Sequence, residues 1–237
     1  MDTQPVIEPE VTPVAAPAAV SKPPAHSRPA AKKPAGLPIP EALFSLAIDD
    51  NDGIIAASLR NMLRYGLAAA FLAELGLANK IQMAEDRLTL AGTDPTGDAL
   101  FDDILAMVAA EKKPRKLGRW IESIQSKLTL KQVALRLVER KGIVIEKKHY
   151  SWVIPFPAFP KVAASAKYSV KNHLRGIVLA GEPANPADIV LLSLLKACRM
   201  LRFVFTRDER KFADQKVAAL VQNEVFGETV AKLLAEK

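Results

Sequence analysis

Several residue types are scarce in this chain, and each scarcity excludes a class of protein. The 237 residues include one cysteine, Cys198, which excludes a framework of intramolecular disulfides and favours a reducing compartment. No apolar run approaches the roughly 18 to 20 residues that a membrane-spanning helix needs. The N-terminus has prolines and acidic residues where a secretory signal peptide would have a basic start and an apolar block. These features predict a cytoplasmic protein.

Side chains that commonly carry catalysis are also few. Of the three histidines, His26 lies near the N-terminus and the other two stand alone in the sequence, so no histidine cluster has metal-ligand spacing. Cys198 lies within the apolar stretch "LLSLLKACRML", as is typical of a buried, unreactive thiol. The string "TGDALFDD" is explained by helix capping, since no glycine-rich phosphate loop accompanies it. We therefore predict a protein that is not an enzyme and has no catalytic residues, metal site or cofactor.

Proline and alanine are abundant in the first 40 residues. This segment holds ten of the 17 prolines and eight alanines, and it has no aromatic residue. Such a segment cannot bury enough apolar surface to offset the entropy lost on ordering. We predict a disordered tail over residues 1–40, followed by one globular domain over residues 41–237.

The formal net charge is +7, and most of it belongs to the predicted domain. The tail has four basic and three acidic residues, so the remainder carries +6. A basic domain favours anionic partners such as nucleic acids, phosphorylated ligands or anionic lipid surfaces, although ordinary solubility charge is the alternative. The basic residues are dispersed, without a helix-turn-helix, zinc finger or aromatic RNA-binding motif. We expect no nucleic-acid partner.

Helical periodicity dominates from residue 41 onward. The stretch "EALFSLAIDDNDGI" predicts a short apolar segment and then an aspartate-rich turn that starts the next helix. Residues 54–77 have apolar side chains at helical spacing and few polar residues between them, which predicts a helix buried on most sides. Residues 79–98 alternate like a short strand pair. Helical patterns follow over residues 97–113, 116–128, 130–141, 162–180, 187–201, 208–221 and 224–235. The predicted fold class is mostly α, a helical domain with a buried central helix.

One apolar segment cannot be a helix because three prolines interrupt it. The sequence "IVIEKKHYSWVIPFPAFP" alternates like two strands around a turn, which predicts a projecting β-hairpin. Its large side chains are Tyr150, Trp152, Val153, Ile154 and Phe156. Tryptophan and tyrosine favour the lipid–water boundary, and the neighbouring lysines favour anionic head groups. The alternatives are that these side chains pack on a second copy of the chain, giving a homo-oligomer, or on the chain's own helices.

Two pairs of basic residues have the i, i+4 spacing of one helix face. They are Arg60 with Arg64 and Lys127 with Lys131. If the pairs converge in the fold, they could hold a phosphorylated head group by charge-assisted hydrogen bonds. The stretch "EKKPRK" adds a third basic patch, whereas Arg136 falls on the opposite side of its helix from the two lysines.

Several motifs in this order resemble the Golgi phosphoprotein 3 family, and more its bacterial branch. They are "IDDNDG", "YGLAAAFLAELGLANKI", "DPTGDALFDDIL", "RWIESI", "LVERKGIV" and "FPAFP", spread over about residues 41–235. The resemblance implies a helical domain with a buried central helix and a projecting β-hairpin. In eukaryotic members it also implies attachment to the cytosolic face of the Golgi through phosphatidylinositol 4-phosphate. For the eukaryotic members it further implies that glycosyltransferase tails are recruited as protein cargo, and that the hairpin serves self-association and membrane contact.

The resemblance also indicates which residues would meet a head group. The family's head-group tryptophan aligns with Leu59 and a nearby arginine with Ala68, while its basic pair falls near Lys127 and Lys131. Arg60 and Arg64 lie close to the two replaced positions. We therefore predict a peripheral membrane protein that binds anionic lipid head groups, phosphatidylinositol 4-phosphate being one candidate, through a basic surface and the apolar hairpin. The alternative is a homo-oligomeric protein-interaction scaffold without specific lipid recognition.

Overall fold

The computed structural model describes residues 37–50, 53–141 and 164–236, and most of these are helical. The elements in chain order are α1 (Ile39–Ala47), α2 (Ala57–Leu77), β1 (Ile81–Ala84), β2 (Arg87–Leu90), α3 (Ala99–Ala109), β3 (Arg115–Lys116), α4 (Leu117–Lys127), α5 (Leu130–Lys141), α6 (Ala164–Arg175), the π-helical turn η1 (Gly176–Ala180), α7 (Pro186–Ala197), the 3-10 turn η2 (Leu201–Phe203), α8 (Arg210–Leu220) and α9 (Val225–Ala235). The predicted fold class is confirmed.

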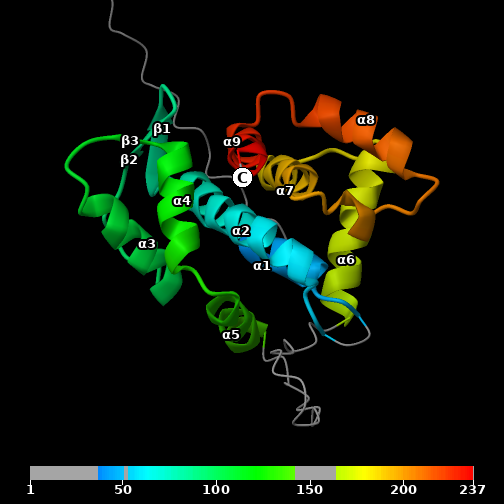
Figure 1. The fold of residues 1–237 in the computed structure, drawn as a ribbon, viewed down its shortest axis with the longest axis horizontal. Coiled ribbons are helices and arrows are strands. Elements are labelled where there is room, and N and C mark those ends of the chain that lie inside the picture. Colours follow the sequence, from blue (N-terminus) through cyan, green and yellow to red (C-terminus); the bar gives the residue numbers. More distant parts are fainter. Residues whose placement is uncertain (1–36, 51–52, 142–163, 237) are drawn as a thin grey trace, which may run out of the picture. The chain divides into compact units, whose positions relative to one another are not determined.

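Helix α2 is the buried central helix that the sequence predicts. It packs against α1, α4, α7 and α9, and these helices surround it in Figure 1. Every residue from Tyr65 to Ala73 is buried. This stretch has no charged side chain and several alanines, so neighbouring helices can approach it from all sides.

The closest approach to α2 occurs at Gly66. A Cβ atom at this position would lie 2.7 Å from the Cys198 sulfur and 3.1 Å from a methyl group of Leu43, so any side chain here would displace α7 or α1. The Cys198 thiol donates a hydrogen bond to the carbonyl of Met62 at 3.3 Å. Burial raises the pKa of Cys198 to about 12, so the thiol stays protonated at neutral pH.

A small antiparallel sheet follows α2, in the order β1-β2-β3. Ala84 pairs with Arg87 across a two-residue turn, Glu85 and Asp86, whose φ values of 48° and 65° are those of a type I′ turn. The strand pair predicted from residues 79–98 is therefore confirmed. The third strand, β3, has two residues and pairs with β2 just before α4 begins. It is too short to show an alternating pattern in the sequence.

The aspartate-rich segment between α1 and α2 forms a turn, as predicted, but the expectation that it starts the helix was wrong. The Gly53 amide donates to the carbonyl of Asp49 at 3.1 Å, whereas α2 begins at Ala57 and has no side-chain cap. The carboxylate of Asp50 instead lies 2.6 Å from the Lys167 ammonium of α6. Burial alone would raise the pKa of Asp50, but the hydrogen bond and charge of Lys167 outweigh it and the pKa is lowered.

The C-terminal part consists of α6 to α9, where the sequence predicts four helices. The helix predicted over residues 162–180 ends in a π-helical turn, η1. The helix predicted over residues 187–201 is followed by the short turn η2. Arg175 at the end of α6 binds Glu209, just before α8, with both of its terminal nitrogens at 2.6 Å from a carboxylate oxygen. This bidentate pair fixes the start of α8 against α6.

The predicted β-hairpin lies outside the described residues, because the gap at 142–163 contains Tyr150, Trp152, Val153, Ile154 and Phe156. The predicted tail lies outside them as far as residue 36.

Candidate functional site

Lys127 and Lys131 do not share one helix, so the prediction that they form an i, i+4 pair was wrong. α4 ends at Lys127, and α5 begins at Leu130. A reciprocal cap separates the helices: the Thr129 hydroxyl accepts from the Gln132 amide at 3.2 Å, and the Gln132 side chain accepts from the Thr129 amide at 2.9 Å. This Thr-x-x-Gln pattern is a capping box, which starts a new helix. Both lysines are exposed on either side of the break.

Arg64 joins the same region from α2. Its guanidinium donates to the main-chain carbonyls of Gln125 at 2.5 Å and Ser126 at 3.4 Å, next to Lys127 in the chain. An arginine at this position offsets the partial negative charge at the C-terminus of α4. Arg64 is half-buried, and part of its hydrogen-bonding capacity is already used within the fold.

Arg60 lies one turn earlier on the same side of α2. It is half-buried, and its Nε donates to the carbonyl of Ile55 at 3.0 Å. The fold thus brings Arg64 and Lys127 together, places Lys131 directly after the break, and sets Arg60 one turn away on α2. Within the described part of the chain, no carboxylate forms an ion pair with Arg64, Lys127 or Lys131. We define the junction surface as the four residues Arg60, Arg64, Lys127 and Lys131.

The two positions that the resemblance implies for head-group contact lie in the core. Leu59 and Ala68 of α2 both have 0% of their surface exposed. Neither can touch a ligand at the surface of the described fold. These two positions therefore add no contact to the junction surface.

The third basic patch, "EKKPRK", lies at the other end of α4. This helix has 11 residues, and a rise of about 1.5 Å per residue separates its ends by about 16 Å. Arg115 pairs with Glu111 at 3.3 Å and lies over the Trp120 ring at 4.9 Å, while Lys116 pairs with Asp86 at 3.4 Å. This patch therefore does not contribute to the junction surface.

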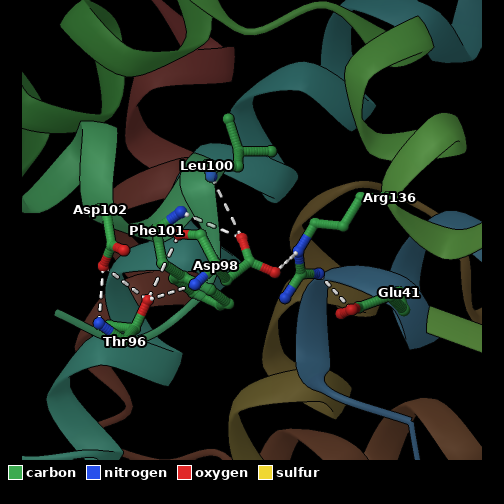
Figure 2. Close-up of polar contacts among 7 residues, drawn as sticks. All are labelled: Glu41, Thr96, Asp98, Leu100, Phe101, Asp102 and Arg136. Atoms are coloured by element: carbon green, nitrogen blue, oxygen red, sulfur yellow. Dashed lines mark hydrogen bonds and ion pairs between the residues drawn. The ribbon is translucent and has the colours of Figure 1, made fainter. Parts of the chain in front are cut away.

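The position of α5 depends on a buried ionic cluster around Arg136. Its Nε donates to the Asp98 carboxylate at 2.6 Å, and its Nη1 contacts the Glu41 carboxylate. Figure 2 shows the guanidinium between the two carboxylates. The Arg136 side chain is 6% exposed, and it also lies over the rings of Phe71 at 5.5 Å and Phe101 at 4.7 Å. The cluster joins α5 to α1 and to the start of α3.

Asp98 has a second role in the same cluster, because it caps α3. Its carboxylate accepts from the amides of Leu100 at 3.2 Å and Phe101 at 3.3 Å. One turn on, the amide and hydroxyl of Thr96 both donate to Asp102 at 2.7 Å, and these hydrogen bonds lower the pKa of Asp102 (Figure 2). The capping role predicted for "TGDALFDD" is confirmed. The ion pair between Asp98 and Arg136 was not predicted. The sequence signal for a buried ionic cluster was Glu41, the one charged residue of α1.

The histidine–carboxylate pair His173 and Asp188 lies at a helix start. His173 lies 2.9 Å from the Asp188 carboxylate, but Asp188 belongs to the capping box that starts α7 with Asn185. Among the described residues, no three histidine, cysteine or acidic side chains gather in a way that could hold a metal ion. None of the helices in the described ranges has the length and hydropathy to cross a bilayer.

The chain was compared with known proteins. No curated protein matched it. The family model described as Golgi phosphoprotein 3 (GPP34) matches residues 39–237, which include every helix and strand described above. The chain therefore belongs to the Golgi phosphoprotein 3 (GPP34) family.

Proposed function

We propose that this chain is a peripheral membrane protein that binds anionic lipid head groups through the junction surface. Lys127 and Lys131 supply exposed positive charge, and Arg64 and Arg60 supply half-buried positive charge behind them. The segment 142–163 follows α5 directly and supplies Tyr150, Trp152, Val153, Ile154 and Phe156 as an apolar anchor. The protein acts by binding and not by catalysis, on the cytosolic face of a membrane, which is the Golgi in a eukaryotic cell.

The contact between Arg64 and the end of α4 carries this proposal. Because the guanidinium donates to the carbonyls of Gln125 and Ser126, the positive charge of Arg64 lies at the last turn of α4, which ends at Lys127. Each lysine near an anionic surface contributes about 1 kcal/mol to binding. Family membership is consistent with the same function, since the match to the Golgi phosphoprotein 3 (GPP34) family spans the described domain.

The junction surface favours recognition of charge over recognition of one particular lipid. The ammonium groups of Lys127 and Lys131 are point charges and lack the planar fork with which arginine grips a phosphate. Leu59 and Ala68 are buried and add no contact. We therefore expect phosphatidylinositol 4-phosphate to bind as one anionic lipid among others. Self-association through the hairpin segment would add avidity, and protein cargo would be recruited by the membrane-bound oligomer.

Vesicle flotation tests this function. The full chain is mixed with neutral phosphatidylcholine vesicles, with vesicles containing phosphatidylserine, and with vesicles containing phosphatidylinositol 4-phosphate at equal charge. We expect binding to both anionic compositions and not to the neutral one. The double variant Lys127→Gln/Lys131→Gln loses about 2 kcal/mol, or roughly thirty-fold in affinity. Lys211→Gln on α8, which removes an exposed lysine elsewhere, has a much smaller effect.

The same experiment separates the alternatives. Absence of flotation on both anionic vesicle types would overturn the proposal. If light scattering then shows an oligomer that deletion of residues 147–161 converts to a monomer, the scaffold interpretation replaces it. A Trp152→Ala variant that floats like the native chain would remove the anchor and leave the charged surface.

A further inference from the structure

A second concave surface lies among α2, α7, α8 and α9. The hollow measures about 740 Å³, in the range of sites for organic ligands and far larger than a single ion requires. The lining residues from α9 have helical spacing, so the hollow is a groove along one face of that helix. Its apolar wall includes the half-buried side chains of Met62, Val221 and Leu234.

Two cations at the end of α7 line the same groove. Lys196 and Arg199 are exposed, and neither forms an ion pair with any residue in the described ranges. Arginine and lysine that lack an internal partner are available to an anionic group.

The carboxylates that line the groove are already engaged. Glu224 caps α9, accepting from the amides of Phe226 at 3.1 Å and Gly227 at 2.8 Å. Glu228 lies 2.7 Å from the Lys232 ammonium, one turn away on α9. The groove therefore presents two cations without an ion-pair partner beside an apolar wall, while Glu224 keeps its negative charge at the N-terminus of α9. This combination favours a ligand with one anionic group and an apolar body.

The backbone at Arg199 provides a separate observation. This residue follows the C-cap of α7 with φ of 56°, a left-handed conformation in which glycine is favoured. Its amide donates to Lys196 at 3.0 Å, and the Met200 amide donates to Leu195 at 2.7 Å, which is the Schellman motif. The other described non-glycine residues with positive φ are asparagine, aspartate and glutamate, so Arg199 is the sole cation in this set. The helix end therefore accounts for the backbone conformation of Arg199, which holds the start of its side chain in a fixed position at the end of α7.

We propose that this groove binds a single-chain anionic amphiphile, a molecule with a carboxylate or phosphate head and an alkyl chain. The head group lies on Lys196 and Arg199, where the arginine fork can hold two oxygens at once. The chain lies against Met62, Val221 and Leu234. This site uses none of the residues of the junction surface, so it is independent of the membrane-binding proposal.

Calorimetric titration of the full chain tests the ligand class. The probes are monomeric decanoate, decyl phosphate and decanol, which share a chain and differ in head-group charge. We expect both anionic probes to bind and decanol to bind at least tenfold more weakly. Equal binding of decanol and decanoate would overturn the proposal, because the cations would then contribute nothing. Binding to phosphatidylserine vesicles without binding to either monomeric anion would also overturn it.

Arg199→Gly separates a binding role from a structural one. Glycine relieves the left-handed strain, so the melting temperature should rise by about 2–4 °C for a chain of this size. Binding of decanoate should nevertheless weaken at least tenfold, and Lys196→Gln should weaken it similarly. The matched control is Lys216→Gln on α8, an exposed lysine outside the groove, which should bind decanoate as the native chain does.

A variant that fills the groove completes the test. Ala231 lies in the groove lining and is exposed, so Ala231→Trp should block decanoate binding while the chain stays folded by circular dichroism. Unchanged binding in Arg199→Gly or in Ala231→Trp would contradict the proposal. Vesicle flotation of Arg199→Gly should equal that of the native chain, so failure of the groove proposal remains distinct from failure of the junction surface.

Discussion

The guanidinium of Arg136 lies 2.6 Å from the carboxylate of Asp98, although 38 residues separate them in the chain. Asp98 starts α3, and Arg136 lies within α5. The junction surface continues from α5 into α4, so this internal pair holds the helix whose first turn carries Lys131. The buried Arg136 cluster thus helps to position the junction surface.

Removing Arg136 should destabilise the domain strongly. Arg136→Ala removes the positive charge that lies between the buried Glu41 and Asp98 carboxylates, and removing one partner of a buried ion pair costs about 3–5 kcal/mol. Urea unfolding followed by circular dichroism measures the change. The control is Arg119→Ala, whose partner Glu122 lies on the surface, with an expected change within about 0.5 kcal/mol. Equal effects for the two variants would contradict a structural role for the cluster.

Two glycines of α2 should respond in opposite directions to the same substitution. Gly66→Ala adds a methyl group 2.7 Å from the Cys198 sulfur, and overpacking of this kind costs about 1–3 kcal/mol. Gly76→Ala meets no atom within 4 Å and should raise stability by about 0.5–1 kcal/mol, because alanine favours the helix. Thermal unfolding of both variants tests the sign. A stabilised Gly66→Ala protein would show that α7 can move away from α2.

The pair between Arg175 and Glu209 should make stability depend on pH. The Arg175 hydrogen bond and the Thr206 amide lower the pKa of Glu209 from 4.5 to about 2. The folded state therefore binds this proton less readily than the unfolded state, so the pair stabilises the fold above pH 4.5 and loses this effect as the pH falls toward 2.

Urea unfolding at a series of pH values measures this effect. Glu209→Gln should be less stable than the native chain at pH 6 to 7, and the difference should shrink as the pH falls toward 2. A difference that stays constant over this range would attribute the effect to packing and not to charge.

The Cys198 thiol should resist alkylation in the native protein. Its pKa of about 12 leaves almost no thiolate at pH 8, and the side chain is fully buried. We expect iodoacetamide to modify it at the rate of unfolding, so that modification becomes fast once urea unfolds the chain. Mass spectrometry after timed quenching measures the rate. Rapid modification in native buffer would show that α7 opens without global unfolding.

Local patterns predicted most helices of the described chain, because apolar residues recur at helical spacing along the amphipathic helices. The stretch from Tyr65 to Ala73 is a different case, since a run of alanine and large apolar residues without charge indicates a helix buried on all sides. The strand pair at Ile81–Ala84 and Arg87–Leu90 was predicted from alternation in the same way. These are signals that each segment carries by itself.

The site was harder to predict because it depends on contacts between distant segments. The spacing of Lys127 and Lys131 matches one helix, and only the capping pair of Thr129 and Gln132 reveals the break between two. The contact of Arg64 with α4 spans more than sixty residues. No periodicity within either segment indicates it. Leu59 illustrates the same difficulty. The resemblance aligns it with a tryptophan that contacts a lipid head group, whereas in this fold it is buried in the core.

The Arg136 cluster also constrains the order in which the chain can complete its fold. Glu41 and Asp98 leave the ribosome before Arg136 does, so the segments that carry them can first pack only without the buried ion pairs that Arg136 makes. A fragment that stops at Lys127 should therefore be less stable than the complete domain. Although α5 bears part of the outer charged surface, it thus also completes part of the interior.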